Sequence, residues 1–573
     1  MILMVCIGFY SCTTKHSKFV IENPINQIKL GRIDSMPNLP KPFKIMDFKN
    51  LAKGFDSLVF DDAQTGDYWP LIWKDDSRKN FNQETFGIYT AMGDLRQGAE
   101  HNNGIFHESL ATIGSVLGAT LIGIDKSNQN GKNYVSMLKN YFNSDTNWNI
   151  VMNNTCPEVA LLGGGYARDW WYDVYPNVLF YGLADFYQKE KDYSTIMRSV
   201  ADKFYEADSV MVGNYAHSYF DYAKLEPKDN WICKQQDAAA GHAYVLYSAY
   251  QKFQDPKYLQ GAKSSLEALL AQTDNRFYEI LMPFGAYVAA RLNAEEGTNY
   301  DYSKILNWTF NGTPECREGW GVLVGNWNGY DVSGIVGSTV DHGGFGFLMN
   351  TYDAMWPLVP MVRYDQRYAS AIGKWMLNAS NALKFFYPYE MADEHQTIPE
   401  QKQYTKGVIA YEGLIQKAHF EKYEHLQAPV AIGDGPHWVK GNPDVSQFSV
   451  YGSGHVGIAG SIISKTNVEN ILQLNLLATD FYRDDACPSF LYYNPNPEAK
   501  EVTISVGENH LKIYDAIKRA FIAENVKNNV TFTIAKEQAS LLVWVPQDAV
   551  ITEKDGKLYA NDVIIDYRYS SAK

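Results

Sequence analysis

The sequence predicts a mainly α-helical fold, an (α/α)6 toroid of six helical hairpins that is followed by a small antiparallel β domain. From about residue 100, long apolar helical segments follow one another in pairs. The first member of each pair is rich in Gly, Ala and aromatic residues, whereas several second members carry more charge. Inner helices of a ring pack on all sides and need small residues, while outer helices expose one face to water. From about residue 490 the pattern alternates with a period of two, as half-buried strands do.

Six pairs of helical segments are predicted along the chain. They are 104–124 with 134–142, 173–187 with 193–205, 236–253 with 256–270, 278–292 with 302–308, 342–362 with 364–386, and 456–464 with 468–479. An α-solenoid would show the same alternation, but its units keep a tighter period. Irregular insertions, notably residues 387–452, favour a closed ring with functional loops.

Four regions are expected. Residues 1–18 are a lipoprotein-type export signal and tether, and residues 19–95 are an extended segment with short strands such as 57–60. The toroid occupies residues 96–490, and the β domain residues 491–573. Within that domain, residues 501–506, 530–534 and 540–545 alternate as strands do.

The N-terminal run MILMVCIGFYSC is too short to span a bilayer and indicates the hydrophobic region of an export signal. The position of Cys12 resembles that in bacterial lipoprotein signals, in which this cysteine is lipidated. The run lacks the usual Lys/Arg segment before it, and a buried N-terminal strand is the alternative. We therefore expect export to the periplasm or outer membrane, with the lipid on Cys12 as the only membrane contact.

Composition excludes several classes of protein. The 573-residue chain has a formal net charge of −14 and no basic stripe, so nucleic acid is not an expected partner. The six cysteines are scattered without a CxxC pair, which leaves open one bridge among the last four but indicates no disulfide framework. No His-x₃-His or comparable spacing supports a metal site, and no cofactor is expected. The oligomeric state stays open.

The chemistry is expected where loops lead into the inner helices, because a ring of hairpins leaves a funnel at that end. Five of the six predicted entrances carry an acid or a histidine beside glycine, aromatic or amide residues. The richest entrance is the stretch GGGYARDWWYDVYPN, residues 163–177. Pro176 suits the first turn of a helix, which predicts a helix start near residues 174–176 and places residues 168–173 in a loop at the rim. Residues 314–346, rich in glycine and aromatics, fit a shaped wall of the same funnel.

Each acid at an entrance has a structural alternative. An aspartate at a helix start is ordinarily an N-cap, and this reading is preferred for Asp237. Asp169 and Asp341 lie among aromatics and glycines, so function and capping stay balanced for them. Glu108 lies in a first helical turn, where helix stabilisation is the alternative. Of the adjacent Trp170 and Trp171, one is expected to pack and the other to stack on substrate.

Six hairpins in a ring, the lipoprotein-like signal, aromatic loops and a short C-terminal β unit together resemble the six-hairpin glycosidase-like superfamily. The resemblance covers roughly residues 80–490 and rests on architecture rather than on a diagnostic motif. It implies a glycoside hydrolase acting on an oligosaccharide or polysaccharide fragment, with uronic-acid-containing glycans among the candidate substrates. Hydrolysis then needs two carboxylates flanking the bond, a general acid and a base or nucleophile.

Asp169 and Asp341 are the expected catalytic pair, with Glu108 as the substitute. His107, His342 and His455 are expected to bind sugar hydroxyls or tune the acid, and Arg168 to clamp a uronate. The other expected substrate-binding residues are Asn103, Tyr166, Trp170, Trp171, Asp237, Trp320 and Trp327.

Two other functions stay open. Asn102-Asn103 followed by His107 and Glu108 has a distant likeness to the asparagine–histidine segment of heparinase-like polysaccharide lyases, with Tyr166 or Tyr172 as the phenol. Such lyases usually carry a larger C-terminal β region. A surface glycan-binding protein without catalysis is the third class. The sugar, the linkage, endo or exo action and the stereochemical outcome are not readable from the sequence.

Overall fold

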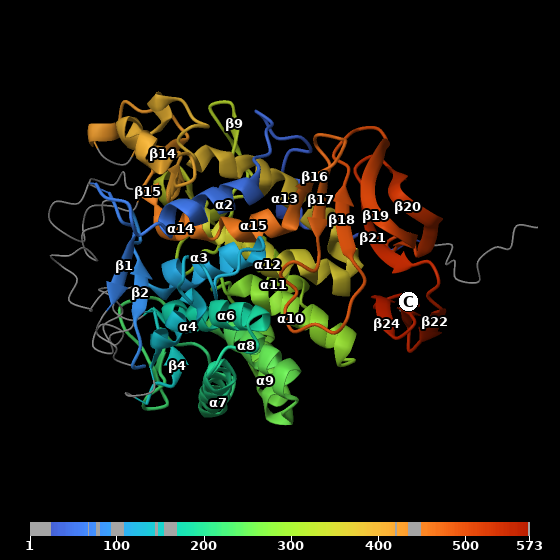
Figure 1. Ribbon diagram of the computed structural model, residues 1–573, viewed down its shortest axis with the longest axis horizontal. Helices are drawn as coiled ribbons and strands as arrows, with labels where there is room; N and C mark the ends of the chain where they lie inside the picture. Colours follow the sequence, from blue (N-terminus) through green and yellow to red (C-terminus); the bar gives the residue numbers. More distant parts are fainter. Residues whose placement is uncertain are drawn as a thin grey trace, which may run out of the picture.

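The computed structural model describes residues 24–66, 68–75, 81–92, 108–143, 147–153, 169–418, 421–433 and 448–570. A ring of helices forms one part of the molecule, and the C-terminal strands lie beside it (Figure 1). Among the described residues, no helix is both long and apolar enough to cross a bilayer.

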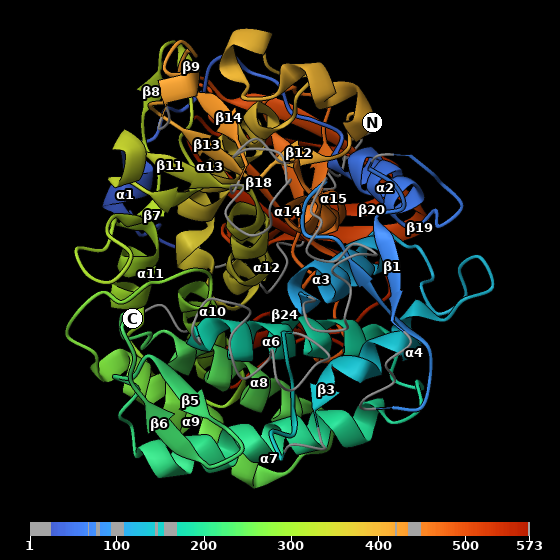
Figure 2. The ribbon, with the colours of Figure 1, turned by 90° about the vertical axis from the view of Figure 1, so that its left-hand side faces the viewer.

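Six inner segments pack in chain order and close on themselves. They are α3 (Ser109–Leu121), α6 (Trp170–Phe186), α8 (Ala238–Phe253), α10 (Met282–Glu295), α12 (Leu348–Tyr364) and the short consecutive helices α14 (Val450–Gly454) and α15 (Val456–Ile462). Each contacts the next, and α14 and α15 contact both α12 and α3. Figure 2 shows these helices around the middle of the molecule. The predicted (α/α)6 toroid is confirmed.

Glycine permits the close approach at which the ring closes. A Cβ atom added at Gly457 would lie 1.9 Å from the Gly118 carbonyl oxygen, and one added at Gly118 would lie 2.4 Å from the Gly454 oxygen. Helices α3 and α15 therefore meet backbone to backbone. The small residues expected of inner helices are required at this contact.

Five outer helical segments follow their inner helices in the chain, and the sixth precedes them all. They are α4 (Tyr134–Met137) continued by the 3-10 turn η2 (Leu138–Tyr141), α7 (Tyr193–Met211), α9 (Pro256–Ala271), α11 (Ser303–Phe310), α13 (Ala369–Ala382) and α2 (Phe48–Val59). Helix α2 packs on α15 and α3, so the sixth outer position is filled from the N-terminal segment.

Two predictions about this sixth pair were wrong. Residues 57–59, expected as strand, end helix α2, whose buried Phe48, Ala52, Phe55 and Val59 follow the three-to-four spacing of a helix face. Residues 468–479, expected as a helix, contain strand β17 (Leu472–Asn475), in which buried and half-buried residues alternate. The ring is therefore closed by a segment about 400 residues away from its partner in the chain.

The start of α6 also differs from the prediction. The helix begins at Trp170, and Pro176 lies inside it rather than in its first turn. Nearly every residue of α6 is buried, and Pro357 and Pro360 lie inside the equally buried α12. Packing on all sides compensates for the backbone hydrogen bond that each proline removes.

A five-stranded sheet packs against α12 through β10 (Val336–Ser338), and three of its strands precede α12 in the chain while two follow it. Its order is β14 (Val430–Ile432), β13 (Gly413–Ile415), β11 (Phe345–Phe347), β10 (Val336–Ser338) and β7 (Trp320–Val322). Residues 342–347, expected as the start of a helix, instead form part of the 3-10 turn η3 (Asp341–Gly343) and strand β11. His342 in that turn has φ 51°, which an α-helix does not allow.

The C-terminal β domain is confirmed. A six-stranded antiparallel sheet has the order β16 (Ile463–Lys465), β17, β18 (Ser489–Tyr493), β21 (Ala539–Pro546), β19 (Lys500–Asp515) and β20 (Ala520–Ile534). Helix α13 packs on β18 and β21, which joins the sheet to the ring. A second sheet contains β22 (Ile551–Lys554), β23 (Lys557–Ala560) and β24 (Val563–Asp566).

The remaining elements are short. They are α1 (Gly31–Asp34), β1 (Ile72–Asp75), β2 (Thr85–Ile88), β3 (Phe142–Asn143), β4 (Ile150–Val151), β5 (Tyr219–Asp221), β6 (Glu226–Lys228), β8 (Asn326–Trp327), β9 (Tyr330–Asp331), β12 (Ala410–Tyr411) and β15 (Phe448–Ser449).

Candidate active site

Five of the inner helices, α3, α6, α8, α10 and α12, are each followed by helical structure that returns along the outside of the ring, so these five begin at the same end. The segments that lead into α6, α8, α10 and α12 therefore come together. Their side chains meet around Asp169, the residue that directly precedes α6.

Asp169 is held as a buried, hydrogen-bonded carboxyl group. Its side chain makes no N-cap hydrogen bond, although the residue occupies the N-cap position. Instead, Gln235 Nε2 donates to Asp169 Oδ1 at 2.5 Å, and Tyr278 is a second hydrogen-bond partner. Burial raises the pKa of Asp169 to about 6, although these hydrogen bonds and the charge of Arg317 act in the opposite direction. A carboxyl group in this range exchanges protons near neutral pH.

A second carboxylate lies beside this group. Glu279 is ion-paired with Arg317 through Oε1, and its Oε2 accepts from Asn350 Nδ2 at 2.7 Å. The Arg317 guanidinium lies 3.8 Å from the centre of the Trp320 ring, and the Trp320 indole N–H donates to the Glu279 backbone oxygen at 2.9 Å. Since both carboxylate oxygens are occupied, Glu279 anchors Arg317 in place.

Asp237 is a third buried carboxyl group of this region and is hydrogen-bonded to the Tyr278 backbone. Its Oδ2 accepts from the Tyr278 backbone N–H at 3.1 Å, and its side chain makes no N-cap bond to helix α8. The residue is 1 % exposed, and burial raises the pKa of its carboxyl group to about 7. The N-cap role preferred from the sequence is therefore not observed, and the buried carboxyl group accepts a hydrogen bond from the Tyr278 backbone instead.

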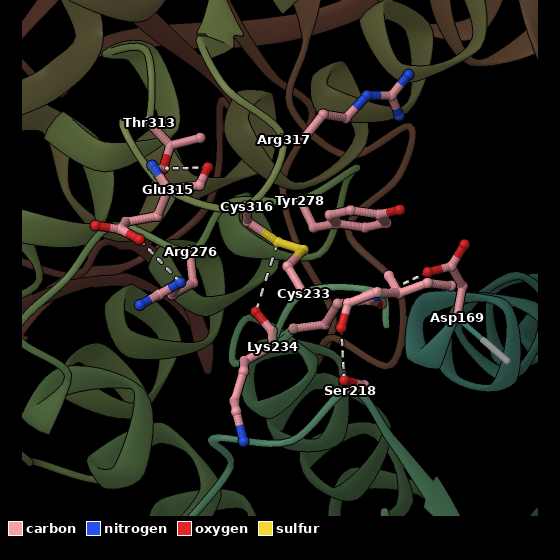
Figure 3. The surroundings of a disulfide bond; sticks show 12 residues. Asp169, Ser218, Cys233, Lys234, Arg276, Tyr278, Thr313, Glu315, Cys316 and Arg317 are labelled. Atoms are coloured by element: carbon pink, nitrogen blue, oxygen red, sulfur yellow. Dashed lines mark hydrogen bonds and ion pairs between the residues drawn. A yellow bond between two sulfur atoms is a disulfide. The ribbon is translucent and has the colours of Figure 1, made fainter. Parts of the chain in front are cut away.

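A disulfide bond joins two of the converging segments. Cys233 and Cys316 have their Cα atoms 5.1 Å apart and are separated by 83 residues. Cys233 is two residues before Gln235, and Cys316 directly precedes Arg317. Figure 3 shows the Tyr278 hydroxyl pointing toward Asp169 beside this bond. The one bridge left open by the sequence thus fixes two partners of Asp169.

Asp341 lies in the hairpin between β10 and β11. Ser338 Oγ donates to the Glu318 backbone oxygen at 2.7 Å, and Thr339 N donates to the Gly319 oxygen at 2.8 Å. These bonds place the hairpin against the segment that carries Arg317. The Asp341 side chain is 58 % exposed and lies 3.4 Å from His342 Nε2. Asp341 is therefore an accessible carboxylate, in contrast to the buried Asp169.

Three expected sugar contacts are core residues instead. His455 is fully buried, with Nδ1 2.6 Å from Asp353 Oδ1 and Nε2 2.9 Å from the Leu110 backbone oxygen. Burial lowers the pKa of His455, but Asp353 and the Leu110 carbonyl outweigh it and raise the pKa above its ordinary value. The buried ion pair and the bond to Leu110 link α3, α12 and the α14–α15 segment, so both ring nitrogens of His455 are occupied by protein partners.

The same correction applies to two tryptophans. Trp170 is fully buried, stacks on Tyr215 at 5.6 Å and donates to the Tyr222 hydroxyl at 3.1 Å. Trp320 is fully buried under Arg317. Trp170 is buried because helix α6 begins at this residue, earlier than expected. Trp320 is buried because all three residues of strand β7 are buried.

The remaining described candidates lie at the edge of the core. Trp171 is 3 % exposed, and its ring lies 4.1 Å from that of Tyr172. Trp327 is 7 % exposed and packs over Gly344. Glu108 precedes α3, is 4 % exposed and makes no N-cap bond. The candidates Asn103, His107, Tyr166 and Arg168, with the lyase candidate Asn102 and the lipidation candidate Cys12, lie outside the described residues.

Sequence reasoning missed Gln235, Tyr278, Glu279 and Arg317. Gln235 and Tyr278 each precede an inner helix by a few residues, which is the signal used for Asp169. A search that includes amide and hydroxyl side chains before each helix, and not only acids and histidines, identifies Gln235 and Tyr278. Within the described ranges, no group of three or more His, Cys, Asp or Glu side chains is arranged to hold a metal ion.

Comparisons with known proteins give likenesses of overall fold. No family model and no curated protein matches the chain. A GH127 β-L-arabinofuranosidase from Geobacillus stearothermophilus T6 is similar over 91 % of this chain and 85 % of its own, with 9 % identity and a TM-score of 0.30. A second GH127 β-arabinofuranosidase is similar over 92 % and 85 %, with 9 % identity and a TM-score of 0.36. An unsaturated glucuronyl hydrolase from Streptococcus agalactiae is similar over 61 % and 89 %, with 10 % identity and a TM-score of 0.28. Likenesses of this size assign no activity and no residue.

Proposed function

We propose that the protein is a glycoside hydrolase that cleaves an oligosaccharide or polysaccharide fragment. The observation that carries the proposal is the Asp169 carboxyl group, which is buried where the segments leading into four inner helices converge. Burial raises the pKa of this group to about 6. A carboxyl group that is protonated in this range can donate a proton to a leaving glycosidic oxygen.

Asp169 is the proposed general acid. Gln235 and Tyr278 hold its carboxyl group in one orientation, and the nearby charge of Arg317 keeps the pKa from rising further. After bond cleavage the carboxylate is stabilised by the same partners. The proton therefore leaves and returns at one fixed group.

Asp341 is the proposed second carboxylate. It is exposed, and its hairpin lies against the segment that carries Arg317, whose charge acts on Asp169. Its proposed role is to activate a water molecule or to attack the sugar carbon. Glu279 is less suited to this role because Arg317 and Asn350 occupy both of its oxygens. Glu108 is the substitute in this proposal. The charge of Arg317 is balanced by its ion pair with Glu279, so this part of the site suits a neutral sugar at least as well as a uronate.

The experiment that tests the proposal is a product assay on the purified protein with a panel of neutral and uronic-acid-containing oligosaccharides. New reducing ends without ultraviolet absorbance support hydrolysis. Absorbance from an unsaturated product would instead identify a lyase, and binding without either product a glycan-binding protein. Loss of hydrolysis in Asp169→Asn, with activity kept in the exposed control Asp562→Asn on the β23–β24 turn, assigns the acid.

We also propose that the protein is exported and lipidated at Cys12, on the residue pattern of the N-terminal run. The Cys233–Cys316 bond supports export, because disulfides persist in oxidising compartments. Incorporation of labelled fatty acid that is lost in Cys12→Ser tests this proposal. An unlabelled wild-type protein in a bacterial host would contradict it.

A further inference from the structure

Trp231 stands out among the large apolar side chains of the described residues. It is 81 % exposed, on the loop between β6 and Cys233. Aromatic rings normally contribute to stability by burial, and a tryptophan also offers an N–H donor at its edge. The exposed indole of Trp231 therefore does not stabilise the fold by burial.

The loop that carries Trp231 is fixed on both sides of it. Asn230 Oδ1 accepts from Ile232 N at 2.8 Å, and Ser218 Oγ donates to the Ile232 backbone oxygen at 2.8 Å. The next residue, Cys233, is bonded to Cys316. The indole is therefore presented on an ordered backbone, which reduces the entropy lost when a ligand binds.

Trp231 is also close to the candidate active site. Gln235 follows Trp231 by four positions in the chain, so their Cα atoms lie at most about 14 Å apart. Gln235 contacts Asp169 directly. The indole thus lies within the reach of a short oligosaccharide whose scissile bond is at Asp169.

Polar groups accompany the exposed ring. Asp229 and Lys234, on either side of it in the chain, are ion-paired at 2.9 Å with 48 % and 46 % of their side chains exposed. A sugar ring presents an apolar C–H face and a rim of hydroxyl groups. The indole matches the face, and the carboxylate and ammonium match hydroxyl groups as acceptor and donor.

We propose that Trp231 is a stacking platform for a sugar unit of the substrate that lies outside the bond-cleaving position. The unit is a neutral pyranose or furanose ring, with Asp229 and Lys234 beside it. The proposal deepens the proposed function and rests on it. It makes the enzyme selective for oligosaccharides over small glycosides.

The test measures binding and turnover as a function of chain length, from disaccharides to hexasaccharides of the same sugar. Binding is measured by calorimetry in an Asp169→Asn background, so that no ligand is cleaved. Trp231→Ala is expected to raise the Kd of the longer ligands roughly tenfold and to leave the shortest ligand unchanged. Trp231→Phe is expected to recover part of the affinity. The control is Phe186→Ala, which removes a ring that is 47 % exposed at the far end of α6 from Asp169.

The outcomes separate the platform from the proposed activity. If the wild type cleaves the ligands but Trp231→Ala leaves the Kd unchanged at every chain length, the stacking platform is overturned and the proposed activity is kept. Length-dependent binding through Trp231 without any cleavage by the wild type overturns the hydrolase and keeps the platform. A Trp231→Ala protein that binds sugars normally but loses self-association in ultracentrifugation would assign the indole to a protein contact, against the proposal.

Discussion

The side-chain amide of Gln235 connects the Asp169 carboxyl group to the start of helix α6. Its Nε2 donates to Asp169 Oδ1 at 2.5 Å, while its Oε1 accepts from the Trp171 backbone N–H at 3.0 Å. Gln235 thus satisfies a backbone donor of the first helical turn, a task that an N-cap side chain ordinarily performs. Asp169 is freed from that task and turned toward Tyr278 and Arg317.

Asp169→Asn is expected to lower kcat by roughly 10²- to 10⁴-fold, because the amide cannot donate the proton that a general acid supplies. Asp341→Asn is expected to cause a loss of similar size through the second carboxylate. Thermal unfolding should change little in either variant, because asparagine at position 169 keeps an acceptor for Gln235 and the side chain at position 341 is exposed. Near-normal turnover in both variants would contradict the assignment of Asp169 and Asp341 as the catalytic pair. Normal turnover in Asp341→Asn alone would make Glu108 the second carboxylate.

Gln235→Leu is expected to shift the pH profile. A general acid must be protonated, so kcat/KM falls as pH rises through the pKa of Asp169, which is about 6. The Gln235 hydrogen bond lowers that pKa, and its removal therefore moves the basic limb to higher pH. Rate profiles of wild type and variant on one substrate measure the shift. A limb that stays in place, or moves to lower pH, contradicts the assigned proton donor.

The double variant Cys233→Ser/Cys316→Ser is expected to lose stability and to disturb the same carboxyl group. Removing a bridge that closes a long loop typically costs about 2–4 kcal/mol of unfolding free energy. The segments of Gln235 and Arg317 are then no longer tied together, so two of the three interactions that lower the pKa of Asp169 weaken. Urea unfolding and the pH profile report the two effects. Cys487→Ser is the matched control, because Cys487 is a half-buried free thiol, and it should alter neither.

The ring was predictable from the sequence because its signal is local. Paired apolar segments and the switch to period two from about residue 490 each extend over many residues, and the structure confirms five predicted helical pairs and the β domain. Closure of the ring was not predictable in this way. Helix α2 reaches its partners α15 and α3 only in the folded protein, where the buried pair of Asp56 and Lys126 at 2.7 Å helps to hold it.

The candidate site was predictable only in part for the same reason. The stretch that contains Asp169 is visible as an unusual cluster of aromatics, acids and glycines. Helix α6 begins at Trp170 rather than near Pro176, and both tryptophans are buried, Trp170 completely and Trp171 with 3 % of its surface exposed. The residues that set the pKa of Asp169 come from segments up to about 150 residues away, so no local pattern joins Gln235, Tyr278 and Arg317 to it.

Asp237→Asn is expected to make the protein more stable than wild type at alkaline pH. Burial raises the pKa of Asp237 to about 7 in the folded protein, whereas an unfolded aspartate titrates near 3.9. Between these values the folded state binds more protons than the unfolded state, so stability falls as pH rises, and the full loss is present above pH about 7. Asparagine keeps an acceptor for the Tyr278 backbone N–H and does not ionise.

The difference in unfolding free energy between Asp237→Asn and wild type should therefore move in favour of the variant by about 2–3 kcal/mol between pH 5 and pH 8. Urea unfolding followed by tryptophan fluorescence at the two pH values measures it. Asp169 titrates in both proteins, so its contribution cancels in the difference. The exposed control Asp562→Asn should show no such change with pH. A difference that is independent of pH, or that favours wild type at pH 8, would show that burial does not raise the pKa of the Asp237 carboxyl group.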